Sequence, residues 1–260
     1  MGGMGDDGRT VQLAFDEGGR DGGGLVVLLH GLGATAGVWT PLTARLGCRW
    51  LALDLPGHGG SARLASYDLE TYAAALIPAI VDRARGAPTT LVGHSLGGSV
   101  VLAIAASACG GWAPARAFAL GVKIDWSEAE HARFAALAER PPRRFGTPDE
   151  ALVQHSRLCG LEGVEVDSPL LRRGITKDGE GWQVAMDNRA FAVEPPPVER
   201  MLAEACCPVH LACGADDPMI GLDRLRQFDP SAIAFRGAGH NAMVDAPEAI
   251  AGWLEQSRPG

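Results

Sequence analysis

Short apolar runs recur along the chain and are separated by longer segments of mixed polarity. Leu25–Leu29 is apolar at five consecutive positions, as is typical of a strand that is covered on both faces of a sheet. Val11–Phe15 alternates only weakly between apolar and polar residues, which indicates a strand at the edge of the sheet. The expected strands are Val11–Phe15, Leu25–Leu29, Arg49–Leu55, Thr89–Gly93, Ala115–Val122, Val209–Cys213 and Ala232–Phe235.

Helices are expected between these strands. Thr40 before Pro41 marks a helix start, because proline is favoured at the first helical position. Strands that alternate with helices predict an α/β fold, a mostly parallel and doubly wound sheet with helices on both faces. The expected helices are Trp39–Leu46, Leu69–Arg85, Ser99–Ala106, Ser127–Arg140, Pro148–Leu158 and Pro247–Gln256.

The pattern changes between residues 125 and 197, where charge rises and aromatic residues are scattered. Pro141-Pro142 and Pro195-Pro196-Pro197 interrupt this segment. We interpret the segment as a helical cap or lid that is inserted into the α/β domain. The expected organisation is a disordered leader at 1–9, a first part of the core at 10–124, the cap at 125–197 and a second part of the core at 198–260.

The segment Gly93-His94-Ser95-Leu96-Gly97 lies between an expected strand and an expected helix. A serine between two such glycines can occupy a sharp strand-to-helix turn, because glycine lacks the Cβ that would clash there. The turn lifts the serine hydroxyl above the sheet edge and directs the first N–H groups of the helix towards a bound group. This pattern is typical of the nucleophile elbow of a serine hydrolase and makes Ser95 the candidate nucleophile.

A serine nucleophile needs a general base, and the base needs an orienting carboxylate. His240 is the candidate base, because it lies in a glycine-rich turn after the last expected strand. In open α/β sheets, ligands bind at the carboxyl ends of the strands. Three carboxylates compete for the third role: Asp217, its neighbour Asp216, and Asp125 after an earlier strand. We favour Asp217, since Pro218 holds its backbone extended, and Asp216 and Asp125 remain alternatives.

The tetrahedral intermediate of such a reaction needs two hydrogen-bond donors for its oxyanion. The N–H of Leu96, directly after the nucleophile, is the first candidate. The N–H of Leu32 is the second, because it lies in the glycine turn His30-Gly31-Leu32-Gly33 after a buried strand. Trp126 and Met219 are the candidate substrate-binding residues, and the aromatic and aliphatic character of the cap favours an apolar or mixed small molecule as substrate.

Five motifs and their order along the chain resemble the α/β-hydrolase fold superfamily. The resemblance covers about residues 25–122 and 209–254. The resemblance implies a serine hydrolase that cleaves an ester or thioester through an acyl-enzyme, with no cofactor and no metal. It also implies that Asp54 and His58 belong to a structural turn and have no catalytic role. In chain order, the motifs are the turn at His30–Gly33, the segment Leu53–Gly59, the elbow at Ser95, the turn at Gly214–Pro218 and the turn at Gly237–Asn241.

The same resemblance leaves other activities open, because one fold supports many functions. Members of the superfamily include lyases, carbon–carbon bond hydrolases and cofactor-free oxygenases, and a biosynthetic cyclase would need no additional motif. Some members are ligand-binding receptors that keep an intact triad and show little turnover.

Composition and charge limit the classes of binding partner and the cellular compartment that we expect. The 260-residue chain has a formal net charge of −8 and no run of Lys or Arg, which argues against binding nucleic acid or an anionic membrane surface. The N-terminus lacks the apolar core of a signal peptide, and the six cysteines show no C-x-x-C spacing. We therefore expect a cytoplasmic monomer or homodimer that acts on a small molecule.

Overall fold

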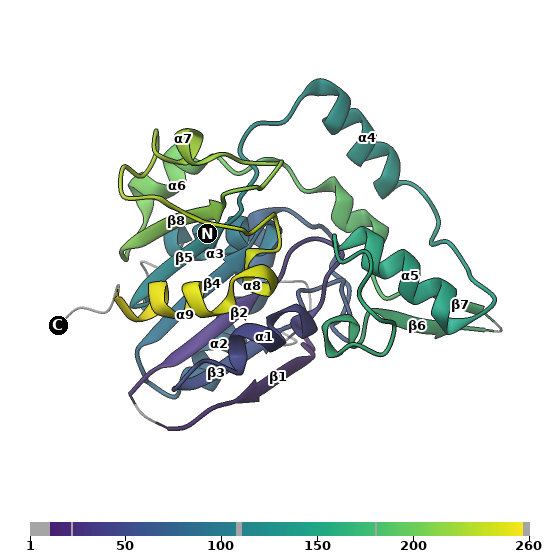
Figure 1. The fold of residues 1–260 in the computed structure, drawn as a ribbon, viewed down its shortest axis with the longest axis horizontal. Coiled ribbons are helices and arrows are strands. Elements are labelled where there is room, and N and C mark those ends of the chain that lie inside the picture. Colours follow the sequence, from purple (N-terminus) through teal and green to yellow (C-terminus); the bar gives the residue numbers. More distant parts are fainter. Residues whose placement is uncertain (1–10, 22, 108–110, 180, 257–260) are drawn as a thin grey trace.

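The computed structural model describes residues 11–21, 23–107, 111–179 and 181–256, so the leader expected at 1–9 lies outside the described residues. The main sheet has seven strands in the order β1-β3-β2-β4-β5-β8-β9 (Figure 1). β1 is antiparallel to β3, and the other neighbours are parallel, which confirms the predicted mostly parallel sheet. The strands are β1 (Phe15–Gly18), β2 (Leu25–Leu29), β3 (Arg49–Leu53), β4 (Thr89–His94), β5 (Arg116–Leu120), β8 (Val209–Gly214) and β9 (Ile233–Phe235).

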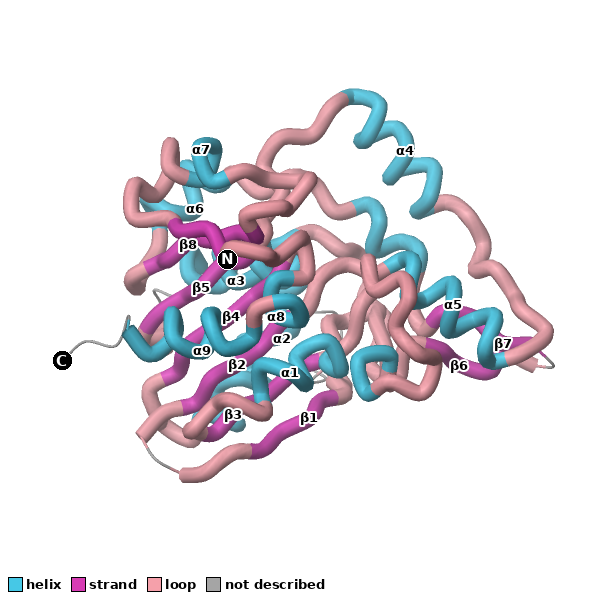
Figure 2. Tube along the Cα trace, viewed as in Figure 1, coloured by secondary structure: helices cyan, strands magenta, loops and turns pink. Residues whose placement is uncertain are grey.

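The interior strand β2 shows why helices must cover both faces of the sheet. Leu25, Val27 and Leu29 pack in one core cluster, whereas Val26 and Leu28 pack in the other, because successive side chains of a strand point to opposite faces. Helices α2, α3 and α6 contribute to the first cluster, and η1, α1, α8 and α9 to the second, so helices flank the sheet on both sides (Figure 2). These elements are η1 (Ala36–Trp39), α1 (Thr40–Thr43), α2 (Leu69–Ala84), α3 (Leu96–Ser107), α6 (Val198–Glu204), α8 (Ala242–Asp245) and α9 (Pro247–Gln256), with α7 at Leu222–Leu225.

The segment between β5 and α6 lies to the right of the sheet in Figure 1, and we call it the cap as a name for this position alone. Its helices start at capping boxes, in which Ser127 and Thr147 each bond the third residue of the helix that follows. The segment is not wholly helical as expected, since β6 and β7 form an antiparallel pair. Its elements are α4 (Glu128–Ala138), α5 (Pro148–Leu158), η2 (Pro169–Leu171), β6 (Ile175–Asp178), β7 (Gly181–Val184) and η3 (Asn188–Ala192).

Several predicted elements differ from the structure by up to three residues at a boundary, as for α3, which begins at Leu96 and not at Ser99, and two elements differ more. The edge strand expected at Val11–Phe15 is β1 at Phe15–Gly18, because pairing with β3 sets its position, with Phe15 opposite Leu53. The helix expected at Trp39–Leu46 is replaced by the short η1 and α1, which end at Thr43.

A buried ion pair joins the cap to the core. Arg173, from the segment between β5 and α6, donates to both carboxylate oxygens of Asp54 at 2.7 and 3.1 Å and also bonds Asp16. The backbone N–H groups of Ala36 and Gly60 donate to the same Asp54 carboxylate. Burial opposes ionisation of Asp54, but these donors, Arg173 foremost, hold its pKa below the ordinary value. The Asp54 carboxylate therefore links Arg173 of the cap to the turn after β3.

Candidate active site

Ser95 occupies the turn between β4 and α3, as the Gly-x-Ser-x-Gly pattern predicts. Its φ of 52° lies in the left-handed region, which costs a residue with a side chain about 1–3 kcal/mol and recurs at functional sites. The turn requires both glycines, since a Cβ at Gly93 would lie 2.1 Å from the carbonyl oxygen of Gly97 and a Cβ at Gly97 would lie 2.1 Å from that of Leu29. The Ser95 N–H donates to the carbonyl of Leu120 on β5, so the sheet itself holds this strained turn.

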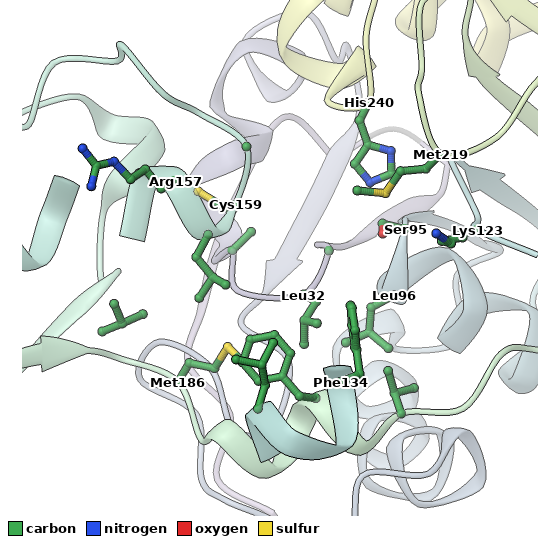
Figure 3. Close-up of a pocket in the computed structure, with 18 of the residues that line it drawn as sticks. Leu32, Ser95, Leu96, Lys123, Phe134, Arg157, Cys159, Met186, Met219 and His240 are labelled. Atoms are coloured by element: carbon green, nitrogen blue, oxygen red, sulfur yellow. The ribbon is translucent and has the colours of Figure 1, made fainter. Parts of the chain in front are cut away.

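His240 and Asp217 are brought together from two separate loops. The Nδ1 of His240 lies 2.9 Å from Oδ2 of Asp217, whose side chain is fully buried. The other carboxylate oxygen of Asp217 accepts the N–H of Met219 at 2.8 Å. These bonds fix the carboxylate and the Nδ1 side of the His240 ring, and His240 lines the cavity. Figure 3 shows that ring pointing towards Ser95.

The two competing carboxylates lie elsewhere. Asp125 is exposed and forms a bidentate pair with Arg224 at 2.8 Å on each oxygen. Asp216 is exposed, and its N–H bonds the carbonyl of Ala238. Of the three candidates, Asp217 is the one that the structure places against His240.

Ser95 and His240 line a cavity of about 1030 Å³ between the core and the cap (Figure 3). This is at the upper end of the range of small-molecule sites. Its apolar walls come largely from the cap, where Trp126 packs edge-on against Phe134, and Phe134 against Phe191. The apolar cap residues of the lining include Trp126, Phe134, Leu137, Leu158, Val184, Met186 and Phe191.

The remaining predicted site residues also line this cavity. Leu32 and Leu96 lie on the same wall below Ser95 in Figure 3. Leu96 is the first residue of α3, so its N–H is among those that a helix leaves without an intrahelical acceptor. Trp126 and Met219 both face the cavity, and Met219 lies beside His240.

His94 supports the loop that carries His240. Its Nε2 bonds the backbone carbonyl of His240 at 2.8 Å, and the two rings are 4.6 Å apart. Burial, with His240 beside it, holds the pKa of His94 well below the ordinary value. His94 is therefore a neutral donor that fixes the His240 backbone.

Sequence reasoning missed two links between the cap and the residues around Ser95 and His240. The buried Asn241, next to His240, donates from Nδ2 to the carbonyls of Cys159 and Gly160 at the end of α5, both at 2.9 Å. Lys123, which lines the cavity near Ser95, forms an ion pair with Glu130 of α4. The glycine-rich turn around His240 indicated a candidate catalytic residue. Nothing in the sequence indicated that the adjacent Asn241 contacts the cap.

Within the described ranges, no group of three or more His, Cys, Asp or Glu side chains is arranged to hold a metal ion. No helix in the described part of the chain is long and apolar enough to cross a membrane.

Comparisons with known proteins agree with the fold. Residues 26–253 match the model of the alpha/beta hydrolase family. A pimeloyl-[acyl-carrier protein] methyl ester esterase of Methylococcus capsulatus is 41% identical over 87 residues, which are 33% of this chain and 32% of that protein. The chain thus matches about a third of that esterase's length. A 2-succinyl-6-hydroxy-2,4-cyclohexadiene-1-carboxylate synthase of Salmonella paratyphi A is 27% identical over 251 residues, 92% of this chain and 95% of the synthase.

Solved structures share the fold. The thioesterase domain from the curacin biosynthetic pathway superposes with a TM-score of 0.75 at 20% identity, covering 94% of this chain and 95% of that domain. At this identity the likeness concerns the fold and not the substrate.

Proposed function

The chain belongs to the alpha/beta hydrolase family, and from this premise we propose that it is a serine hydrolase. It cleaves an ester or thioester of a small, largely apolar molecule through an acyl-enzyme on Ser95. The observation that carries this proposal is the bond of 2.9 Å between His240 and the buried Asp217, with Ser95 on a strained elbow at the same cavity. A nucleophile, a base and an orienting acid are the three groups that acyl transfer requires.

Each group has a defined step in the proposed reaction. His240 Nε2 takes the Ser95 proton as Oγ attacks the carbonyl carbon, and Asp217 stabilises the imidazolium that forms. The N–H groups of Leu32 and Leu96 donate to the oxyanion. His240 then gives its proton to the leaving alcohol or thiol. Water, activated by the same base, releases the acid and restores Ser95.

The cavity supports an apolar acyl or alkyl group. Trp126, Phe134 and Phe191 form an aromatic wall on the cap side, and burial of apolar area there contributes roughly 25 cal/mol per Å². The names of two similar proteins, a methyl ester esterase and a thioesterase domain, are consistent with ester or thioester chemistry.

Hydrolysis of p-nitrophenyl esters from acetate to decanoate tests the proposal. We expect turnover with a preference for intermediate or long chains, and a loss of at least about 10⁴-fold in kcat in Ser95→Ala. Hydrolysis that persists in Ser95→Ala, or no turnover with any chain length, would contradict it.

A second candidate is a lyase or synthase in which Ser95 and His240 move a proton without forming an acyl-enzyme. It is favoured by the match over nearly the full length of both chains to the Salmonella synthase. Acid-quenched mass spectrometry during ester turnover separates the two, because only the hydrolase adds the mass of the acyl group to the peptide that contains Ser95.

A further inference from the structure

The arginines of the cap fall into two sets. Four of them pair with carboxylates and do not line the cavity: Arg144, Arg172, Arg173 and Arg189. The other four all line the cavity, and no carboxylate of the described residues lies within 4.0 Å of their guanidinium groups. We call these the cavity arginines: Arg133, Arg140, Arg143 and Arg157.

Acidic side chains outnumber basic side chains in this protein. It contains 31 Asp and Glu residues against 23 Lys and Arg residues. The lack of a carboxylate partner at these four guanidinium groups therefore does not reflect a shortage of acidic residues, and the guanidinium of Arg143 packs over the Phe145 ring at 4.8 Å. Three cap carboxylates also line the cavity: Glu130 pairs with Lys123, Glu194 lies near His131, and Glu162 lies more than 4.0 Å from the guanidinium groups of the cavity arginines. Guanidinium groups bind carboxylates and phosphates through paired hydrogen bonds, so this wall is suited to an anion.

The position of the cavity arginines separates them from the chemistry. They lie on α4, on the loop after it and on α5, whereas Ser95 and His240 lie on the core. Arg157 lies across the cavity from Ser95 and Lys123 in Figure 3. Apolar side chains such as Phe134, Leu158 and Met186 line the same cavity.

We propose, on the basis of the serine hydrolase function, that the substrate carries an anionic group at the end remote from its scissile bond. The cavity arginines bind that group, and an apolar spacer crosses the cavity to Ser95. The anion is an oxyanion, either the carboxylate of a dicarboxylic acid monoester or the phosphate of a phosphopantetheine-type thioester.

Binding to the Ser95→Ala variant tests this proposal without turnover. Isothermal titration compares monomethyl suberate with the neutral dimethyl suberate, and octanoyl phosphopantetheine with octanoyl N-acetylcysteamine, at about 0.15 M salt to screen distant charges. We expect at least one anionic ligand to bind about tenfold or more tightly than its neutral partner, as charge-assisted hydrogen bonds imply. The arm that shows the preference identifies the oxyanion.

Two variants in the same background locate the effect. Replacing all four cavity arginines with Gln should abolish the preference, and a thermal melt verifies that this variant is folded. The matched control is Arg144→Gln, because Arg144 is adjacent to Arg143 but pairs with Asp178 and is not part of the cavity lining. It should keep the preference. Equal binding of anionic and neutral ligands, or a preference that survives the loss of all four arginines, would overturn the proposal.

The parent enzyme distinguishes this proposal from the hydrolase proposal. Hydrolysis of dimethyl suberate with no selectivity for either anion would refute the anion site and leave the hydrolase intact. Selective binding of an anion by a protein that hydrolyses no ester would support the anion site and contradict the hydrolase.

Discussion

Asp217→Asn is the substitution that examines the proposed catalytic geometry most closely. The carboxylate is fully buried, with Oδ2 2.9 Å from Nδ1 of His240 and Oδ1 accepting the N–H of Met219. Asparagine keeps the shape and one acceptor but removes the charge. It can also present an NH₂ group to His240 and favour the tautomer with the proton on Nε2, which cannot accept the Ser95 proton.

The size of the effect follows from the distance. A carboxylate and an imidazolium at this separation attract by about 6 kcal/mol at an effective dielectric constant of about 20. That attraction develops only when His240 takes the proton, so it lowers the barrier and not the substrate affinity. Since about 1.4 kcal/mol corresponds to a factor of ten in rate, we expect kcat to fall by about 10⁴-fold and KM to change little.

The assay is steady-state hydrolysis of a p-nitrophenyl ester by the parent enzyme and two variants. Asp125→Asn is the matched control, because Asp125 is exposed and pairs with Arg224. We expect this control to keep kcat within about threefold of the parent value, as is usual for a surface change. A collapse of kcat in Asp125→Asn, or a loss below about tenfold in Asp217→Asn, would refute the assignment.

Three further predictions concern the groups that hold the site in place. Asn241→Ala removes both hydrogen bonds to the end of α5. For an ester that contacts the cap, the factor by which KM rises should therefore be several times the factor by which kcat falls. A loss of kcat with unchanged KM would instead place the effect of the substitution on the His240 loop. Asp54→Asn should lower the free energy of unfolding in urea by about 3–5 kcal/mol, because Arg173 loses its buried partner; a change under about 1 kcal/mol would contradict this. Burial lowers the pKa of His58 to about 3 and that of His155 to about 4, so the unfolded chain binds protons that the folded protein excludes. Stability should therefore fall as pH drops from about 6.5 towards 4, by on the order of 1 kcal/mol per pH unit for each histidine, and equal urea midpoints at pH 7 and pH 5 would refute this.

The parts of the fold that were predictable are those that local sequence determines. β2 is apolar at every position because both faces are buried, and Pro148–Leu158 matches α5 because Thr147 and Pro148 mark its start. The β6–β7 pair could not be predicted, since Thr176 and Lys177 are exposed and leave no apolar alternation.

The candidate site shows the same division. The glycines around Ser95 are required by contacts of the backbone with itself, and that requirement is visible in the sequence. The choice between Asp217 and Asp125 depends on how two loops fold at the ends of β5 and β8, which spacing along the chain does not specify. Helical spacing places Arg133 and Leu137 on one face of α4, but which face meets the cavity depends on how the cap is positioned.

The central claim is that Ser95 is an activated nucleophile, and covalent labelling tests it most directly. The protein is incubated with a fluorophosphonate, and the adduct is counted by intact mass and located by peptide mapping. We predict one adduct per chain, on Ser95, and none in Ser95→Ala. An adduct on another residue, an adduct that survives in Ser95→Ala, or no adduct at all would contradict the account.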